Sequence, residues 1–169
     1  MKTIKTIRDT DVGSDTSNPE KYEERRAARA IVFDKENKVA LLHATKKGYH
    51  KLPGGGIEAG EDIVEALKRE SLEEIGCNIE NVKELGIIEE YRNQFVMHQI
   101  SYCFIADLAG EKGQNHLEED EVADGFEPVW MSLEEAIKTL ESESTIAHYE
   151  GKFIRLRDLT FLKEAVHHA

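Results

Sequence analysis

The chain has 169 residues, of which 33% are charged, and a formal net charge of −12. A domain of this length buries roughly 70% of the surface of its unfolded chain, so it needs no disulfide to fold. The negative charge argues against nonspecific binding to DNA, RNA or an anionic membrane, because each of these partners requires a basic face.

No internal repeat, low-complexity tract or linker divides the sequence, so we expect a single domain over residues 1–169. The two cysteines, Cys77 and Cys103, lack Cys-x-x-Cys or histidine partner spacing. Nothing resembles a signal peptide or an apolar membrane span. The sequence therefore predicts a cytoplasmic protein with reduced thiols and no membrane partner.

The first part of the chain reads as strands and turns. Residues 1–20 predict an edge strand followed by a polar loop. Residues 27–33 and 38–44 predict a hairpin joined by a polar turn. The bases of residues 46–51 stand just before a glycine-rich run, so they either lie near bound phosphates or form a solvated loop.

Residues 54–77 combine a glycine run, a helix and a further glycine. The helix is expected to end at Gly76, where a left-handed C-terminal cap would fall. At about 100° per residue, Glu70, Glu73 and Glu74 share one helix face. Two of these acids lie inside the apolar stripe of the helix, which a plain amphipathic helix would not show.

Three carboxylates at the edge of a core repel one another and lose hydration, which raises their pKa values unless a positive group lies among them. Hard oxygen ligands, with no clustered Cys or His nearby, favour Mg²⁺ or Mn²⁺ over Zn²⁺. Arg69 could orient one carboxylate by a forked hydrogen bond. A carbonyl of the glycine run could join the metal shell, because glycine lets the backbone approach a ligand closely.

Residues 79–91 and 95–107 predict a pair of strands. The second strand is apolar on both parities, which is typical of a central strand covered on both faces. His98 within it has no partner at metal-ligand spacing. We therefore interpret His98 as a structural or binding residue.

Residues 110–125 predict a long, polar loop, and loops of this length are usually functional or disordered. Within and just after it, residues 118–127 carry six acids and no base. A short strand over 126–131 and a helix with a Ser–Glu capping box should follow. A last helix is expected near 155–167, with Val166 in its apolar stripe.

The glycine-and-acid segment resembles the signature box of the Nudix hydrolases, also called MutT-like proteins. The family pattern places Gly, Glu, Arg-Glu, Glu-Glu and Gly at fixed intervals. The sequence supplies these positions as Gly55, Glu61, Arg69-Glu70, Glu73-Glu74 and Gly76. It departs from the pattern at Ser71 and Cys77, where the family has aliphatic residues, but both are small enough to pack.

The resemblance implies an α/β (α+β) fold, a Nudix-like α/β/α sandwich with a mixed central sheet. It also implies metal-dependent hydrolysis of a nucleoside diphosphate linked to another group. By position in the motif, Glu70, Glu73 and Glu74 should be ligands of Mg²⁺ or Mn²⁺, and Gly54 should offer its carbonyl. Glu73 and Glu74, with Arg69 orienting Glu70, are the expected catalytic residues. No residue is assigned to substrate binding.

The substrate follows only by elimination. ADP-ribose-cleaving members of the family often show a Pro shortly after the box, and dinucleoside-polyphosphate members a Tyr near there. Here that neighbourhood reads Arg92-Asn93-Gln94-Phe95, so a nucleoside triphosphate, an oxidised one included, is the leading hypothesis.

Two alternatives stay open: a non-catalytic nucleotide-sensing module and an isomerase of allylic diphosphates on the same fold. A nucleotide substrate, no nucleic-acid partner and a homodimer are all compatible with the sequence. The acidic residues 118–127 either form a solvated loop or supply an acid that closes over the bound metal and pyrophosphate.

Overall fold

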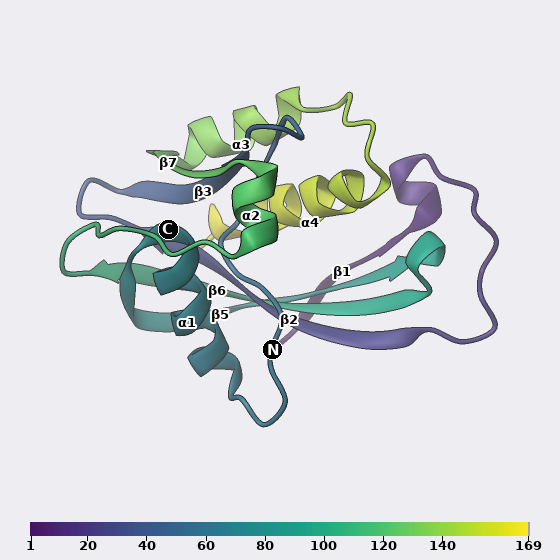
Figure 1. Ribbon diagram of the computed structural model, residues 1–169, viewed down its shortest axis with the longest axis horizontal. Helices are drawn as coiled ribbons and strands as arrows, with labels where there is room; N and C mark the ends of the chain where they lie inside the picture. Colours follow the sequence, from purple (N-terminus) through teal and green to yellow (C-terminus); the bar gives the residue numbers. More distant parts are fainter. Residues whose placement is uncertain (169) are drawn as a thin grey trace.

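The computed structural model describes residues 1–168 and is built on one mixed sheet of seven strands (Figure 1). The strands are β1 (Thr3–Arg8), β2 (Glu23–Phe33), β3 (Lys38–Ala44), β4 (Tyr49–Lys51), β5 (Asn78–Arg92), β6 (Met97–Ala109) and β7 (Phe126–Ser132). Their order is β1-β5-β6-β2-β3-β4, and β7 pairs with β3. The β1–β5 and β2–β6 pairs are parallel, whereas the other pairs are antiparallel.

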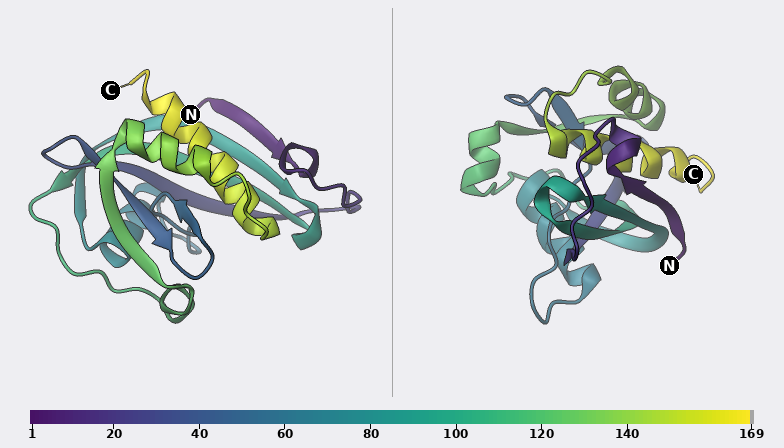
Figure 2. Two further views of the ribbon diagram at one scale, coloured as in Figure 1. Left: turned by 90° about the horizontal axis from the view of Figure 1, so that it is seen from above. Right: turned by 90° about the vertical axis from the view of Figure 1, so that its right-hand side faces the viewer.

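Helices cover both faces of this sheet (Figure 2). They are α1 (Ile63–Ile75), α2 (Glu119–Asp124), α3 (Leu133–Ser142) and α4 (Tyr149–Ala165), with two short 3-10 helices, η1 (Asp9–Val12) and η2 (Asn93–Phe95). Ala66 and Leu67 of α1 pack in one buried cluster with the sheet, and Leu140 and Phe153 of α3 and α4 pack in another. The expected α/β/α sandwich is therefore confirmed.

The expected hairpin of β2 and β3 forms, but its strands separate soon after the turn. Phe33 and Val39 are the only pair that the two strands share. Beyond this pair, the glycine-rich loop hydrogen-bonds to the edge of β2 that β3 has left. There the Ala28 N–H donates to the Gly55 carbonyl at 3.0 Å. This insertion positions the glycines of the box beside the sheet.

Strand β6 is central, as its sequence predicts. It lies between β5 and β2, with Cys103 in the cluster under α3 and α4 and Phe104 in the cluster under α1. His98 stacks on Tyr91 with 4.3 Å between ring centroids, and its Nε2 lies 2.8 Å from Glu89 Oε2. These contacts agree with a structural role for His98.

Two expectations for the C-terminal half were wrong. The segment 110–125 is not all loop, because it contains α2, which begins with a capping box at Glu118 and ends at Gly125 in the left-handed conformation. The last helix begins at Tyr149, six residues before the expected start, and Val166 lies beyond its end and is 51% exposed. The early start was hidden by Gly151, at which a side chain would collide with Ile146 and crowd the Tyr49 ring.

No helix within residues 1–168 is long and apolar enough to cross a membrane.

Candidate active site

A cavity of about 410 Å³ lies beside the glycine run, between α1, α2 and the sheet face under α4. Its acidic lining consists of Glu70, Glu73, Glu74, Glu118, Asp120, Glu121, Asp124 and Glu150. Its basic lining consists of Arg25, Arg29, Lys47, Lys51, Arg92 and Arg157. The four residues expected to form the metal site all line this one cavity.

The glycine run is shaped by two close approaches. Gly54 has a φ of 128°, and a side chain there would collide with the carbonyl of Ala28 on β2. A side chain at Gly55 would collide with the carboxylate of Glu70. Glycine at position 54 therefore lets this loop lie on β2, whereas a side chain at position 55 would displace the Glu70 carboxylate.

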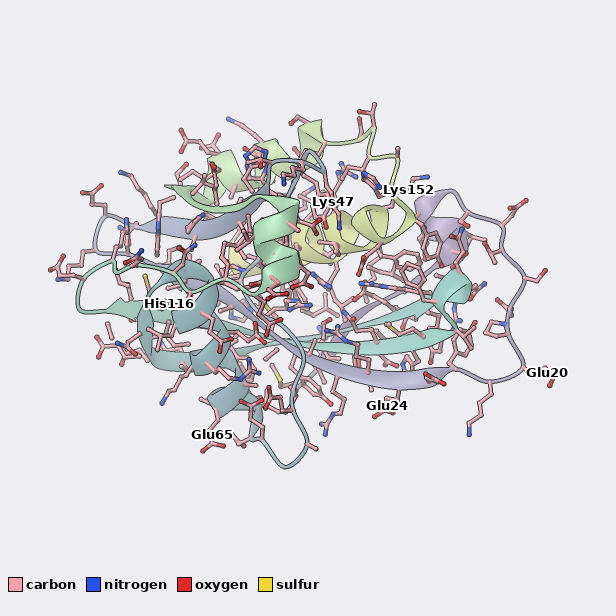
Figure 3. The ribbon with its side chains drawn as sticks, viewed as in Figure 1. Glu20, Glu24, Lys47, Glu65, His116 and Lys152 are labelled. Carbon is pink, nitrogen blue, oxygen red and sulfur yellow. The ribbon has the colours of Figure 1, made fainter. Side chains whose placement is uncertain are left out.

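Helix α1 is closed at both ends by local signals. The Asp62 side chain accepts from the Val64 N–H at 2.9 Å, and Gly76 caps the C-terminus with a φ of 65°. The segment between β6 and α2 then binds carbonyls at the end of the helix. The His116 N–H donates to the Glu73 carbonyl at 2.6 Å, so His116 lies beside α1 (Figure 3). This hydrogen bond therefore places the segment that leads into α2 beside the box glutamates.

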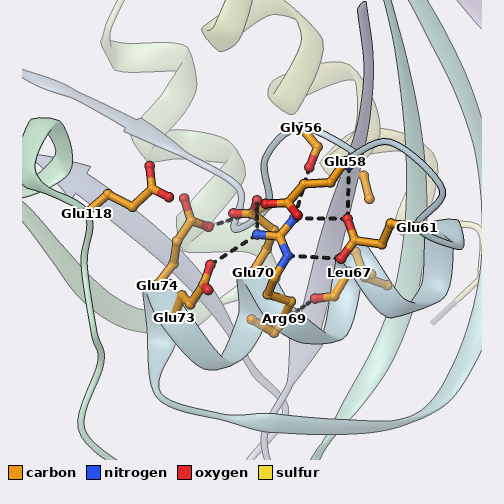
Figure 4. Close-up of polar contacts among 12 residues, drawn as sticks. Gly56, Glu58, Glu61, Leu67, Arg69, Glu70, Glu73, Glu74 and Glu118 are labelled. Carbon is orange, nitrogen blue, oxygen red and sulfur yellow. Dashed lines mark hydrogen bonds and ion pairs between the residues drawn. The ribbon is translucent and has the colours of Figure 1, made fainter.

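Arg69 holds the acids of the box together (Figure 4). Its Nε and Nη2 form a fork with Glu61 at 2.9 and 3.1 Å, and its Nη1 donates to Glu70 at 2.9 Å and to Glu73 at 3.1 Å. The expected contact with Glu70 is present, but the fork belongs to Glu61. Arg69 does not line the cavity, so it positions carboxylates rather than meeting the substrate.

Glu74 is the most enclosed acid of the box, with 1% of its side chain exposed. Its Oε1 lies 2.9 Å from Lys51 Nζ, and its Oε2 accepts from the Gly54 N–H at 2.5 Å. Burial raises the pKa of Glu74, and Lys51 offsets only part of that effect. Burial and the Glu74 charge likewise raise the pKa of Glu70, as expected for crowded carboxylates.

The two departures from the box pattern are accommodated in the core. Ser71 is buried and its Oγ donates to the Leu67 carbonyl at 2.8 Å, one turn back in the helix. Cys77 is fully buried and packs in the cluster between α1 and the sheet. Neither substitution disturbs the helix that carries the glutamates.

The oxygen atoms that line the cavity are of the chemical type that binds a hard divalent cation. The box acids supply carboxylate oxygens, and burial raises the pKa values of Glu70 and Glu74, an effect that a bound cation would oppose. Within residues 1–168, however, no three Asp, Glu, His or Cys side chains converge as a metal site would require. Arg69 lies between Glu70 and Glu73, and Lys51 contacts Glu74, so a cation would have to replace these contacts.

Sequence reasoning missed the arginines of the cavity. Arg29 interrupts the apolar run of β2 and is buried there, which was a signal that could have been followed. Arg92 was read as part of a turn, yet it ends β5 and is 2% exposed. Arg157 lies in the interior of α4, where its sequence neighbours give no indication of a site.

The NUDIX domain family model matches residues 23–154. The chain belongs to the Nudix family. Diphosphoinositol polyphosphate phosphohydrolase 3-alpha of Mus musculus is 30% identical over 134 residues, which is 78% of this chain and 77% of that protein. ADP-ribose pyrophosphatase of Methanocaldococcus jannaschii is 39% identical over 83 residues, covering 47% of this chain and 48% of that protein. These relatives support the expectation of a Nudix-type pyrophosphohydrolase.

Solved Nudix structures share the fold. A MutT protein from Bacillus halodurans has a TM-score of 0.56 and 27% identity, covering 78% of this chain and 80% of its own. A MutT NUDIX hydrolase from Burkholderia pseudomallei has a TM-score of 0.55 and 23% identity, covering 66% of this chain and 85% of its own.

Proposed function

We propose that this Nudix protein cleaves the pyrophosphate bond of a nucleotide or another diphosphate-bearing small molecule with the help of Mg²⁺ or Mn²⁺. The observation that supports this function best is the meeting of Gly54, Glu70, Glu73 and Glu74 at one cavity that also contains basic residues. A divalent cation, when bound, would neutralise phosphate charge and lower the pKa of a water.

The position of each box residue suits it to one role in this reaction. Glu70, Glu73 and Glu74 would hold the cation, with the Gly54 carbonyl as a further ligand. Arg69 fixes Glu70 and Glu73 from behind the cavity wall. Glu73, whose side chain is 35% exposed, or the enclosed Glu74 would accept the proton of the attacking water.

The substrate class is wider than the sequence hypothesis of a nucleoside triphosphate. The relatives are named for diphosphoinositol polyphosphates and for ADP-ribose, and all three substrate classes contain a phosphate anhydride. The single domain over 1–169, the cytoplasmic setting and a homodimer stay predictions from the sequence.

A panel of nucleoside triphosphates, ADP-ribose and diphosphoinositol polyphosphates tests this proposal, with Mg²⁺ or Mn²⁺ present and phosphate-bearing products detected. We expect cleavage of at least one class. Tight nucleotide binding by calorimetry without turnover would favour the sensing module instead. Isomer conversion of an allylic diphosphate would favour the isomerase.

Magnesium should raise the melting temperature of the protein, because a ligand that binds only the native state stabilises it by RT ln(1 + [L]/Kd). At a concentration of 100 Kd this amounts to about 2.7 kcal/mol, or roughly 5–10 °C for a chain of this size. The shift should vanish when Glu70, Glu73 and Glu74 are all replaced by Gln. An equal shift in that triple variant, measured by calorimetric melting, would place the stabilising cation elsewhere, with the acids of residues 118–127 as the next candidates.

Alanine substitutions along α2 should have unequal effects on turnover. Glu118, Asp120 and Glu121 line the cavity, and Glu118 faces Glu74 across it (Figure 4), whereas Glu119 does not line it. If one of the three acids closes over the attacking water, its loss should lower kcat by about 10²–10⁴. Glu119→Ala is the matched control and should be silent. Uniformly small effects on kcat in all four variants would indicate that this segment is solvated and supplies no catalytic acid.

A further inference from the structure

Three of the four arginines that line the cavity are held by other side chains of the protein. The four are Arg25 and Arg29 of β2, Arg92 at the end of β5 and Arg157 of α4. Arg25 Nη1 donates to Gln99 Oε1 at 2.7 Å. The buried carboxylate of Glu90 accepts from Arg92 Nη2 at 2.9 Å and from Arg157 Nη1 at 3.4 Å. These three guanidinium groups are therefore engaged in contacts within the chain.

Arg29 is the arginine without such a partner. It is 6% exposed, and its one hydrogen bond runs from Nη1 to the Ala28 carbonyl at 3.2 Å. Its Nε–H has no acceptor among the described residues, and no carboxylate of residues 1–168 forms an ion pair with it. Burial, together with the charge of Arg157, lowers the pKa of Arg29 to about 10, so it is still protonated at neutral pH.

The buried carboxylates of the arginine network are already used by other cations. Asp158 forms a fork with Arg157 at 2.7 and 3.1 Å, and Glu90 pairs with Arg92 at 2.9 Å. Arg29 is thus the buried cation left over. A buried charge without a partner destabilises the folded protein, so its presence at a cavity indicates that a negatively charged group binds there.

Arg29 lies beside the glycine run and the box acids. A side-chain carbon at Gly54 would approach the Arg29 Cα to 3.0 Å, and the Gly54 N–H donates to Glu74. Burial raises the pKa of Glu70 and the charge of Arg29 opposes that rise, so these two groups lie within electrostatic reach of each other. Arg29 is therefore an unpaired guanidinium next to the position proposed for the pyrophosphate.

Hydrolysis of a pyrophosphate bond redistributes negative charge around the attacked phosphorus. The water oxygen bonds to that phosphorus, the bond to the bridging oxygen breaks, and its electron pair leaves with the bridging oxygen on the other phosphate. One water proton passes to Glu73 or Glu74, and the other stays on the new phosphate. A guanidinium that donates to a non-bridging oxygen transfers no proton, and it accelerates the reaction if its interaction is stronger in the transition state than in the bound substrate.

We propose that Arg29 is a catalytic residue that donates to a non-bridging oxygen of the phosphate under attack. Because no carboxylate neutralises Arg29, its charge acts on the reacting phosphate. The inference rests on the proposed function for the position of the pyrophosphate at the box glutamates. It holds whatever group the diphosphate carries.

Turnover and melting of Arg29→Met test this role together. We expect kcat at saturating Mg²⁺ to fall by about 10²–10³-fold. The melting temperature of the ligand-free protein should stay the same or rise, because Met removes an unpaired buried charge. An unchanged kcat would overturn the proposal. A lower kcat with a lower melting temperature would assign Arg29 a structural role and overturn it as well.

Chemical rescue gives a readout that a structural role would not move. Arg29→Ala removes the guanidinium from the cavity lining and leaves space for a small cation. Added guanidinium ion, below the concentrations that denature the protein, should restore part of the lost turnover, whereas sodium chloride at the same concentration should not. Turnover that guanidinium does not restore would overturn the direct contact with the phosphate.

A binding experiment tests the contact without hydrolysis. The probe is methylenediphosphonate, a diphosphate analogue with a CH₂ group in place of the bridging oxygen, titrated calorimetrically with Mg²⁺ present. We expect its affinity to be about 10-fold weaker in Arg29→Met, because a charge-assisted hydrogen bond is lost. The loss in kcat should exceed the loss in probe affinity, as expected for a contact that strengthens in the transition state.

The control variant is Arg26→Met. Arg26 is exposed on the opposite face of β2, where its Nη2 donates to Tyr102 Oη at 2.7 Å, and it does not line the cavity. Its turnover and its affinity for the probe should equal those of the unmodified protein.

The outcomes separate the two proposals. Hydrolysis by the unmodified protein with equal kcat in Arg29→Met and Arg26→Met rejects Arg29 as a catalytic residue and retains the proposed function. Absence of hydrolysis throughout the panel, with probe binding that depends on Arg29, rejects the proposed function and the catalytic role with it, and leaves Arg29 as an anion-binding residue.

Discussion

Replacing Glu73 or Glu74 with Gln is expected to lower turnover by about 100-fold or more, measured at saturating Mg²⁺. Both side chains line the cavity, and Gln keeps their size while removing the charge that would hold a cation or accept a proton. Near-normal activity in both variants would remove these residues from the catalytic role.

Folding should survive in both variants, and thermal melting checks this. Glu73 is partly exposed and contacts only one N–H of Arg69 through its side chain, so its neutralisation costs little. Glu74→Gln removes a buried charge whose pKa is raised by burial, although it leaves Lys51 without its carboxylate partner. Glu65→Gln is the control, because Glu65 points away from the cavity on the same helix (Figure 3) and Gln can still serve its capping box.

Replacing Glu90 with Gln is expected to lower the free energy of unfolding by about 3–5 kcal/mol, or roughly 6–20 °C in melting temperature. Glu90 is fully buried, and it is the carboxylate between Arg92 and Arg157. Its neutralisation leaves Arg157 with Asp158 as its one carboxylate partner and the buried Arg92 with only the half-exposed Glu150. Glu89→Gln is the matched control, since Glu89 is partly exposed and pairs with His98 instead. Equal melting temperatures for the two variants would contradict the account of this network.

Glu90 should also make the stability of the protein depend on pH in the acid range. Burial alone would raise the pKa of Glu90, but Arg157 and Arg92 outweigh it and hold that pKa below its ordinary value. The folded protein therefore binds this proton less readily than the unfolded chain does. The contribution of Glu90 to stability is complete above its unfolded pKa and is lost as the pH falls through its folded pKa. Glu90→Gln should flatten this part of the stability profile.

The box was predictable from sequence because its signals are local. The spacing of Glu70, Glu73 and Glu74 places them on one helix face wherever the helix packs, and Gly76 ends that helix by its own conformational freedom. The strand pair β5–β6 was predictable for a similar reason, since a short turn joins two strands that follow each other in the chain. Only the partner of Arg69's fork, Glu61, was assigned differently.

The arginines that line the cavity could not be predicted, because their positions depend on contacts between distant parts of the chain. Arg25 contacts Gln99 only because β2 pairs in parallel with β6. Arg157 lies on α4, a helix whose start could not be located from the sequence. Helix α2 was missed because its six residues are mostly acidic and carry little apolar periodicity. Its position depends on the hydrogen bond between His116 and the end of α1.

The most direct test of a metal-dependent pyrophosphohydrolase is the hydrolysis of the best substrate of the panel after metal removal by a chelator and after re-addition of Mg²⁺ or Mn²⁺. The account predicts no product in chelator, full recovery with the cation, and no recovery in the triple Gln variant at Glu70, Glu73 and Glu74. Undiminished hydrolysis in chelator, or recovery in that variant equal to the unmodified protein, would contradict it.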